Sequence, residues 1–413
     1  MNDNQNHMKP KFMEWGIITE ENFTSIKDVP LKRWDPLSTV EITTKDFGLR
    51  TKARFSGHFS YLSPIRGKRP FNYEKDDSLE EDCSEKSNIQ VNDVFSAITE
   101  GKILYNEDGT MLRDGNTIII TEDQTRRENP FSQVPSKIEK LPESCNAVTL
   151  INRFPSMARV IDEKIKLELK EKLTPNSKIS IGINLLTISR DFYPALCLNL
   201  IPEKVLAGVF LSMKAAILYS VEEAINKDYY DIIVSPFFNI GKQVGGSQPR
   251  IHSQVYLDLN GDGHGPRLAA YLKAFKSMKE CHLCKTSHSE NNNNRVVLKT
   301  RFWIFYVAGS PIRNYHLRFY PIEHIRRFSN LKPNQILDLA RSLKIIFKAL
   351  DTLKIERNRN IIFNSCPYGY DADFHMFGDI IPHEIIGGAE MADDMRVARK
   401  LPSEIAKEIR NAI

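Results

Sequence analysis

The stretch "GGSQPRIHSQ", residues 245–254, carries the pattern that decides the fold of this chain of 413 residues. Two glycines and Ser247 lead into His252, and Gln254 follows two residues later. Glycines let a backbone approach a phosphate closely, and a serine hydroxyl can donate a hydrogen bond to it. Because side chains alternate along a strand, His252 and Gln254 share one face. The pattern suits a histidine that attacks phosphorus beside an amide that holds a phosphoryl oxygen. A glycine-rich hairpin with a partly exposed histidine is the plain alternative.

Composition excludes several classes of protein. The net charge of +5 comes from 57 basic and 52 acidic residues, which is too small an excess to indicate a nucleic-acid partner. The longest apolar stretch, "LAGVFLSMKAAILYS", is interrupted by Lys214 and falls short of the roughly 20 residues of a membrane span. Of six cysteines only Cys281 and Cys284 are closely spaced, which is not the pattern of a disulfide framework. We therefore expect a soluble, cytoplasmic protein without a membrane or nucleic-acid partner.

Apolar periodicity predicts an internal repeat. Residues 1–115 have little periodicity, and we expect them to be irregular. The first half then has predicted strands at 117–123, 146–155, 178–188, 195–202, 231–240 and 250–259, with helices at 161–173 and 204–227 and a third ending near residue 280. The second half has predicted strands at 295–307, 316–324, 360–365 and 374–381, with a helix at 334–353. Both halves end in strand, long helix, strand and a histidine-containing strand. This order predicts a repeated α+β unit with a mainly antiparallel sheet.

In this context the chain resembles the galactose-1-phosphate uridylyltransferase branch of the histidine-triad superfamily. The pattern of that family is G-x-S-x-P-H-x-H-x-Q after a strand with Asn-x-Gly, and this chain has "FNIGKQVGGSQPRIHSQ" at 238–254. The resemblance extends to "NRFP" at 152–155, "CHLC" at 281–284 and the C-terminal segment from 371, and it covers about 129–413. It implies tandem histidine-triad halves, 116–280 and 281–413, each with an antiparallel sheet and a long helix. The halves would form an intramolecular pseudo-dimer behind the N-terminal extension.

The resemblance also assigns site residues. His252 matches the nucleophile and Gln254 the phosphate-binding glutamine. The other matched positions contact phosphate (Asn239, Gly245, Gly246, Ser247) or the nucleoside (Asn152, Arg153). Arg250 stands where the family has a zinc-binding histidine, and the remaining zinc positions of this half hold Asn129, Ser132 and Lys204. We expect Arg250 to supply positive charge to the phosphate site in place of that metal.

A metal site is expected in the second half instead. The two-residue spacing of Cys281 and Cys284 lets both thiolates reach one tetrahedral zinc ion. The resemblance implies a structural Cys2His2 zinc site completed by His324 and His375, with Phe377 at the nucleophile position of this half. Two reduced, inert cysteines are the alternative. His282 or His288 in place of a more distant ligand is a further possibility.

Two classes of function follow. The first is a nucleotidyltransferase that moves a nucleoside monophosphate from a nucleotide sugar or similar donor to a phosphorylated acceptor through a nucleotidyl-histidine. A dinucleoside polyphosphate or adenylyl sulfate phosphorylase is a variant of this chemistry. The second is a nucleotide-binding protein that has kept the fold and lost turnover, which the arginine at position 250 favours. A homodimer is also plausible by resemblance, and no redox cofactor is expected.

Overall fold

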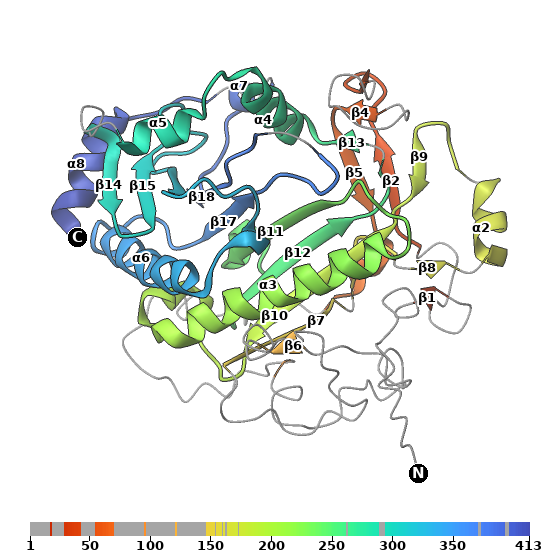
Figure 1. The fold of residues 1–413 in the computed structure, drawn as a ribbon, viewed down its shortest axis with the longest axis horizontal. Helices are drawn as coiled ribbons and strands as arrows, with labels where there is room; N and C mark the ends of the chain where they lie inside the picture. Colours follow the sequence, from red (N-terminus) through yellow and green to blue (C-terminus); the bar gives the residue numbers. More distant parts are fainter. Residues whose placement is uncertain are drawn as a thin grey trace, which may run out of the picture.

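The computed structural model describes residues 17–18, 29–42, 54–69, 95, 120–121, 146–152, 154–158, 160–161, 163–171, 173–261, 263–288, 294–370, 373–392 and 396–413. These residues form a mixed α+β structure around antiparallel sheets (Figure 1). The predicted fold class is confirmed at this level.

One sheet of ten strands runs through both halves of the chain. In sheet order its strands are β14 (Val296–Lys299), β15 (Trp303–Val307), β16 (Leu317–Pro321), β18 (Phe377–Pro382), β17 (Arg359–Asn364), β11 (Ile233–Ile240), β12 (His252–Asp258), β10 (Gly182–Ser189), β7 (Ala147–Ile151) and β6 (Ile120–Thr121). Every neighbouring pair is antiparallel. Strands from the two halves meet where β11 pairs with β17, and there Asn239 lies opposite Asn360.

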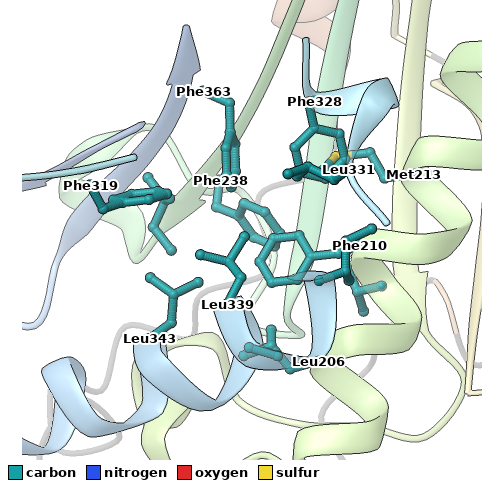
Figure 2. Close-up of a cluster of buried hydrophobic side chains, with 14 of the residues drawn as sticks. Leu206, Phe210, Met213, Phe238, Phe319, Phe328, Leu331, Leu339, Leu343 and Phe363 are labelled. Carbon is teal, nitrogen blue, oxygen red and sulfur yellow. The ribbon is translucent and has the colours of Figure 1, made fainter. Parts of the chain in front are cut away.

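Long helices cover one face of this sheet. Helices α3 (Glu203–Ile225) and α6 (Pro333–Thr352) pack against each other and against the strands, and α8 (Pro402–Ala412) packs beside α6. Figure 2 shows Phe210 of α3 and Leu339 of α6 among Phe238, Phe319 and Phe363 of the strands. Burying each such side chain contributes about 1.5–3 kcal/mol. Because strand residues alternate, the neighbours of these phenylalanines, including the expected site residue Asn239, face the other side of the sheet.

Helix α3 is the one helix among the described residues that is long and apolar enough to cross a membrane. In its most apolar 18-residue window, 83% of the helix is buried inside the protein. Packing in the core therefore accounts for its composition.

The second face of the sheet has a smaller covering. Helix α4 (Pro266–Ser277) places Leu272 and Phe275 against Tyr320, Phe374 and Phe377. The remaining α-helices in the described ranges are α2 (Glu163–Lys170), α5 (His282–His288) and α7 (Gly388–Ala392). Strand β12 lies outside this second apolar cluster.

Short strands from the N-terminal segment also join the fold, so the expectation of an irregular 1–115 is wrong for them. One small sheet contains β5 (Phe59–Leu62), β2 (Leu31–Trp34) and β9 (Ser177–Ile179), and another contains β13 (Gly263–His264), β4 (Arg54–Ser56) and β3 (Val40–Ile42). A third pairs β1 (Ile17–Ile18) with β8 (Val160–Ile161). Strands of two to four residues are too short to show alternation in a sequence, and these depend on partners far along the chain.

A buried ion pair attaches the N-terminal strands to the main sheet. Lys32 of β2 lies 2.7 Å from the carboxylate of Asp258 at the end of β12, and both side chains are buried. The Tyr61 hydroxyl donates to the same carboxylate at 2.6 Å. The Lys32 ammonium also lies over the rings of Phe59 and Trp34, at 4.4 and 5.1 Å.

Two local predictions need correction. Residues 195–200, expected as a strand, form the 3₁₀ helix η7 (Ala195–Leu200) between Pro194 and Pro202. A short apolar run does not by itself distinguish strand from helix. His375, expected on the last strand, lies two residues before β18 begins at Phe377.

Candidate functional site

His252 begins strand β12, and its side chain is buried. Its Nδ1 lies 2.8 Å from the backbone carbonyl oxygen of Arg250. A carbonyl oxygen only accepts hydrogen bonds, so Nδ1 carries the proton of the neutral ring and Nε2 carries the lone pair. The ring of Phe95 lies 6.1 Å from the imidazole. The tautomer is the one that a nucleophile acting through Nε2 requires.

Gln254 follows on the same face of β12. In the sheet it lies between Phe237 of β11 and Leu186 of β10. Its Oε1 is buried and accepts no hydrogen bond from any residue that the structure describes. Buried polar atoms without partners are uncommon in proteins, and a ligand is one explanation for such an atom.

A tight glycine turn precedes this strand. Gly241 and Gly245 have φ values of +93° and +90°, which side-chain-bearing residues rarely adopt. Between them lies the 3₁₀ helix η8 (Lys242–Val244), and the Gly246 N–H donates to the Gly241 carbonyl at 3.0 Å. A Cβ on Gly246 would lie 2.7 Å from that carbonyl oxygen. The turn therefore folds back tightly on the end of β11.

Asn239 lies beneath the glycine turn. Its Nδ2 is 3.3 Å from the position that a Cβ on Gly245 would occupy. The structure thus brings Asn239, Gly245 and Gly246 together, with Ser247 next along the chain toward His252.

Asn152 directly follows strand β7. Its N–H donates to the Asn184 carbonyl at 2.8 Å, and its Oδ1 accepts from the Phe154 N–H at 2.9 Å. Asn184 in β10 lies opposite Tyr256 of β12, and its Oδ1 accepts from the Ser156 N–H. The side chain of Asn184 is buried, and its Nδ2 has no hydrogen-bond partner in the described part of the chain. Arg153, the second expected nucleoside contact, lies outside the described residues.

Arg250 connects two strands of the first half. Its guanidinium donates to the carbonyl oxygens of Ser189 and Arg190 at 3.0 and 3.1 Å, at the end of β10. It also lies 5.7 Å from the Phe192 ring, and the residue is only 2% exposed. Lys204 lies in the first turn of α3, and Asn129 and Ser132 lie outside the described residues.

The four expected metal ligands form one cluster. The ligand atoms of Cys281, Cys284, His324 and His375 all lie within 4.8 Å of one another. The Sγ atom of Cys284 lies 3.3 Å from His324 Nδ1 and 3.5 Å from His375 Nδ1, and the Sγ atom of Cys281 lies 3.4 Å from His375 Nδ1. Bond lengths of about 2.3 Å to sulfur and 2.0–2.1 Å to nitrogen in a tetrahedral zinc site give a sulfur–nitrogen edge of about 3.6 Å. The cluster therefore has the size of a site for one metal ion.

A hydrogen bond orients one imidazole of the cluster, and a carboxylate lies beside the other. His375 Nε2 lies 2.8 Å from the Pro321 carbonyl oxygen, which places the proton on Nε2 and leaves Nδ1 toward the thiols. His324 Nε2 lies 3.0 Å from the Asp373 carboxylate. Burial lowers the pKa of His375 to about 4, so its ring is neutral at pH 7. Burial and the neighbouring Cys281 raise the pKa of Cys284 to about 11, so this thiol needs a metal to lose its proton. Of the two alternative ligands, His282 is exposed, and the side chain of His288 lies outside what the structure describes.

A second polar cluster occupies the same face of the sheet in the other half. The Asp379 carboxylate lies 2.9 Å from His316 Nε2 and 2.8 Å from Arg318 Nε, and it accepts a hydrogen bond from Asn364 at 3.0 Å. Burial alone would raise the pKa of Asp379, but His316 and Arg318 together hold it below its usual range. The Arg318 guanidinium lies 4.6 Å from the ring of Phe377.

Comparison with known proteins shows which proteins this chain is similar to. No protein-family model matches the chain. The curated galactose-1-phosphate uridylyltransferase of Thermotoga maritima is 23% identical over 257 residues, which are 59% of this chain and 76% of that protein. The chain resembles the galactose-1-phosphate uridylyltransferases.

Solved structures extend the likeness to the fold. A uridylyltransferase structure superposes with a TM-score of 0.52 at 20% identity, covering 65% of this chain and 84% of its own. An ADP-glucose phosphorylase from Arabidopsis thaliana with bound ADP-glucose has a TM-score of 0.52 at 16% identity, covering 90% and 99%. At these identities the structures establish a uridylyltransferase-like fold and nothing finer.

Some residues of the candidate site were not identified from the sequence. Asn184 is one of them, since it lies in the strand "GINLLTIS", which is buried at every position. Asn360, which contacts Asn239, is another. The polar residues within an otherwise apolar strand were the available signal in both cases.

Proposed function

We propose that this protein is a nucleotidyltransferase that works through a covalent intermediate on His252. The observation that carries the proposal is the fixed ring of His252. Its Nδ1 is bound to the Arg250 carbonyl, at the head of a strand that follows a glycine turn. Gln254 beside it and Asn239 beneath the turn add amide groups of the kind that stabilise charge on phosphoryl oxygens.

The reaction has two displacement steps. In the first, the Nε2 lone pair attacks the α-phosphorus of the donor, a P–N bond forms, and the P–O bond to the leaving phosphate breaks. The leaving group departs as a sugar 1-phosphate with the electron pair of that bond. In the second step, a phosphate oxygen of the acceptor attacks the same phosphorus and the P–N bond breaks, which returns neutral His252. Dividing one transfer into two steps lowers each barrier.

We propose a nucleotide sugar as the donor, because this chain is similar to a galactose-1-phosphate uridylyltransferase and to an ADP-glucose phosphorylase. The acceptor would be a sugar phosphate or inorganic phosphate. Dinucleoside polyphosphates and adenylyl sulfate are alternative donors for the same chemistry.

We also propose that residues 116–280 and 281–413 are tandem units related by an approximate twofold axis between β11 and β17. Support comes from the register, in which Phe237 faces Ile362 and Asn239 faces Asn360. From that axis outward, the strand order is β11, β12, β10, β7 and β6 on one side and β17, β18, β16, β15 and β14 on the other.

The same symmetry explains why only one half would be catalytic. Gln254 lies opposite Phe237, and Asp379 lies opposite Ile362. Two residues earlier on each strand, His252 therefore corresponds to Phe377. A phenyl ring has no nucleophilic atom, so the chemistry belongs to the first half.

Metal and guanidinium would have matching structural roles in the two halves. We propose that Cys281, Cys284, His324 and His375 hold a structural zinc ion, because two thiolates and two imidazoles suit zinc and leave no open position. By the strand alignment Arg250 corresponds to His375. Its hydrogen bonds to the carbonyl oxygens of Ser189 and Arg190 favour a structural role for Arg250, in which it cross-links two segments where a metal ion would otherwise do so. They favour direct contact with phosphate less. Cytoplasmic location and homodimer formation stay predictions.

The test is a donor-by-donor search for the intermediate. Wild-type protein and His252→Ala would each be incubated with one donor at a time: UDP-glucose, ADP-glucose, diadenosine tetraphosphate or adenylyl sulfate. After an alkaline quench, the mass of the intact protein would be measured by mass spectrometry. At least one donor should leave an acid-labile nucleotide adduct on the wild-type protein and none on the variant. If every donor binds and none forms an adduct or turns over, the protein is a nucleotide-binding protein without transferase activity, the reading that Arg250 favoured.

A further inference from the structure

We propose that Asn360, contributed by the second half, is a positioning residue that sets the hydrogen-bonding direction of Asn239 in the phosphate site of the first half. The inference rests on the proposed function, in that the glycine turn is taken to hold a phosphoryl group. It adds residues that the sequence analysis did not assign to the site.

The geometry fixes both amides. Asn360 Nδ2 donates to Asn239 Oδ1 at 2.8 Å and to the Val244 backbone carbonyl at 3.4 Å. The Val244 carbonyl oxygen only accepts, so it requires the NH₂ group of Asn360 to point toward the turn. The same NH₂ group then requires the oxygen of Asn239 on its side. Asn239 is left with its Nδ2 toward Gly245, at 3.3 Å from the position of a Cβ there.

This direction matters for an anion. Phosphoryl oxygens accept hydrogen bonds and do not donate them, so Asn239 helps only when its NH₂ group faces the ligand. Rotating that amide by half a turn would present its carbonyl oxygen to a negative charge. A neighbour that accepts in place of Asn360 would favour the wrong rotamer.

A second asparagine of the same segment braces the turn. Asn358 Oδ1 accepts from the Gln243 backbone N–H at 3.1 Å, and the side chain of Asn358 lies against Gly241. Asn358 is itself held by Glu356, whose Oε1 accepts from its N–H and Nδ2 at 2.8 and 2.9 Å. The side chain of Asn358 is buried. Both ends of the 3₁₀ segment at 242–244 are therefore tied to residues of the second half.

The experiment compares two variants of Asn360, the variant Asn239→Ala, the double variant of Asn239→Ala with Asn360→Ala, and one control variant. Asn360→Ala removes the donor, and Asn360→Asp keeps the shape but replaces the donor with an acceptor. Asn364→Ala is the matched control, because Asn364 lies on the same strand and face and bonds Asp379, away from the turn. Binding of UDP-glucose and ADP-glucose would be measured by calorimetry. Hydrogen exchange of the amides of 241–246 would be measured without ligand.

Loss of one hydrogen bond in the site should weaken nucleotide binding by about fivefold to tenfold in Asn360→Ala. Asn360→Asp should be weaker still, since its carboxylate repels both Asn239 Oδ1 and a bound anion, whereas Asn364→Ala should bind as the wild type does. Adding Asn239→Ala to Asn360→Ala should cost no more than Asn239→Ala alone, because Asn360 acts through Asn239. In both Asn360 variants the amides of 241–246 should exchange faster than in the control.

Different failures remain distinguishable. If the wild type binds nucleotide and the Asn360 variants match Asn364→Ala in affinity and exchange, the positioning role is wrong. Independent, additive effects of Asn239→Ala and Asn360→Ala would also overturn it. If the wild type binds neither nucleotide, the proposed function fails for these donors, and the exchange rates of 241–246 still decide whether Asn360 holds the turn.

Discussion

Replacing Gly246 by alanine should disrupt the glycine turn by a steric effect that can be calculated from the backbone. A Cβ at this position would lie 2.7 Å from the carbonyl oxygen of Gly241 and 2.8 Å from that of Asn239. Ordinary contacts begin near 3.4 Å, so one or both carbonyls would have to move by about 0.6–0.7 Å. Both atoms belong to the backbone, and neither can rotate away as a flexible side chain would.

The expected cost has two parts. Overpacking of this kind destabilises a protein by about 1–3 kcal/mol. The residue whose backbone carbonyl would move, Asn239, also carries the side-chain amide proposed to bind phosphate, and displacement by about 1 Å in a catalytic site can cost about a hundredfold in rate. We therefore expect Gly246→Ala to lower nucleotide transfer by at least tenfold while the protein stays folded.

The assay pairs chemical unfolding with turnover of the donor that labels the wild type. Gly67→Ala serves as the control, because a Cβ on Gly67 in the 3₁₀ helix η4 (Pro64–Lys68) has nothing within 4 Å. It should match the wild type in activity. If Gly246→Ala unfolds within about 0.5 kcal/mol of the wild type and keeps full turnover, the tight turn is not as described.

Three further predictions concern stability and metal. Asp258→Asn removes the countercharge of buried Lys32 and should lower the free energy of unfolding by about 3–5 kcal/mol, while adding Lys32→Met should restore most of it; equal stability of both variants would contradict this. Purified protein should contain close to one equivalent of zinc, and Cys281→Ser with Cys284→Ser should remove it, so unchanged zinc by metal analysis would refute the site. Asp379→Asn should destabilise the protein most near pH 7. The pKa of this carboxyl is lowered in the folded protein, so its contribution to the free energy of unfolding is present above the unfolded pKa of about 3.9. That contribution disappears as the pH falls through the folded pKa. In pH-dependent unfolding, the difference in stability between wild type and variant should therefore shrink below about pH 4.

The sequence predicts the long elements of this fold well. The apolar composition of α3, the apolar face of α6 and the alternation in β11 come from many residues acting together, so small local exceptions do not hide them. The run at 195–200 was misassigned because six apolar-rich residues fit a strand as well as a 3₁₀ helix. The strands at 31–34 and 59–62 were missed because their partners lie far along the chain.

In the candidate site, too, residues that are close in the sequence could be predicted together, whereas contacts between distant segments could not. His252 and Gln254 are neighbours through the alternation of one strand, so the sequence places them together. The four metal ligands come from segments up to 94 residues apart, and only the family pattern indicated their meeting. Asn360 lies 121 residues from Asn239, and only the pairing of β11 with β17 brings them into contact. No local spacing encodes that register.

The central claim is that His252 becomes covalently modified by a nucleotide. Its most direct test is the mass of the intact protein after incubation with each nucleotide donor and an alkaline quench, followed by peptide mapping of the adduct. The account predicts an acid-labile nucleoside monophosphate on the peptide that contains His252, absent from His252→Ala although that variant still binds the donor. An adduct at another residue, or turnover that survives in His252→Ala, would contradict it.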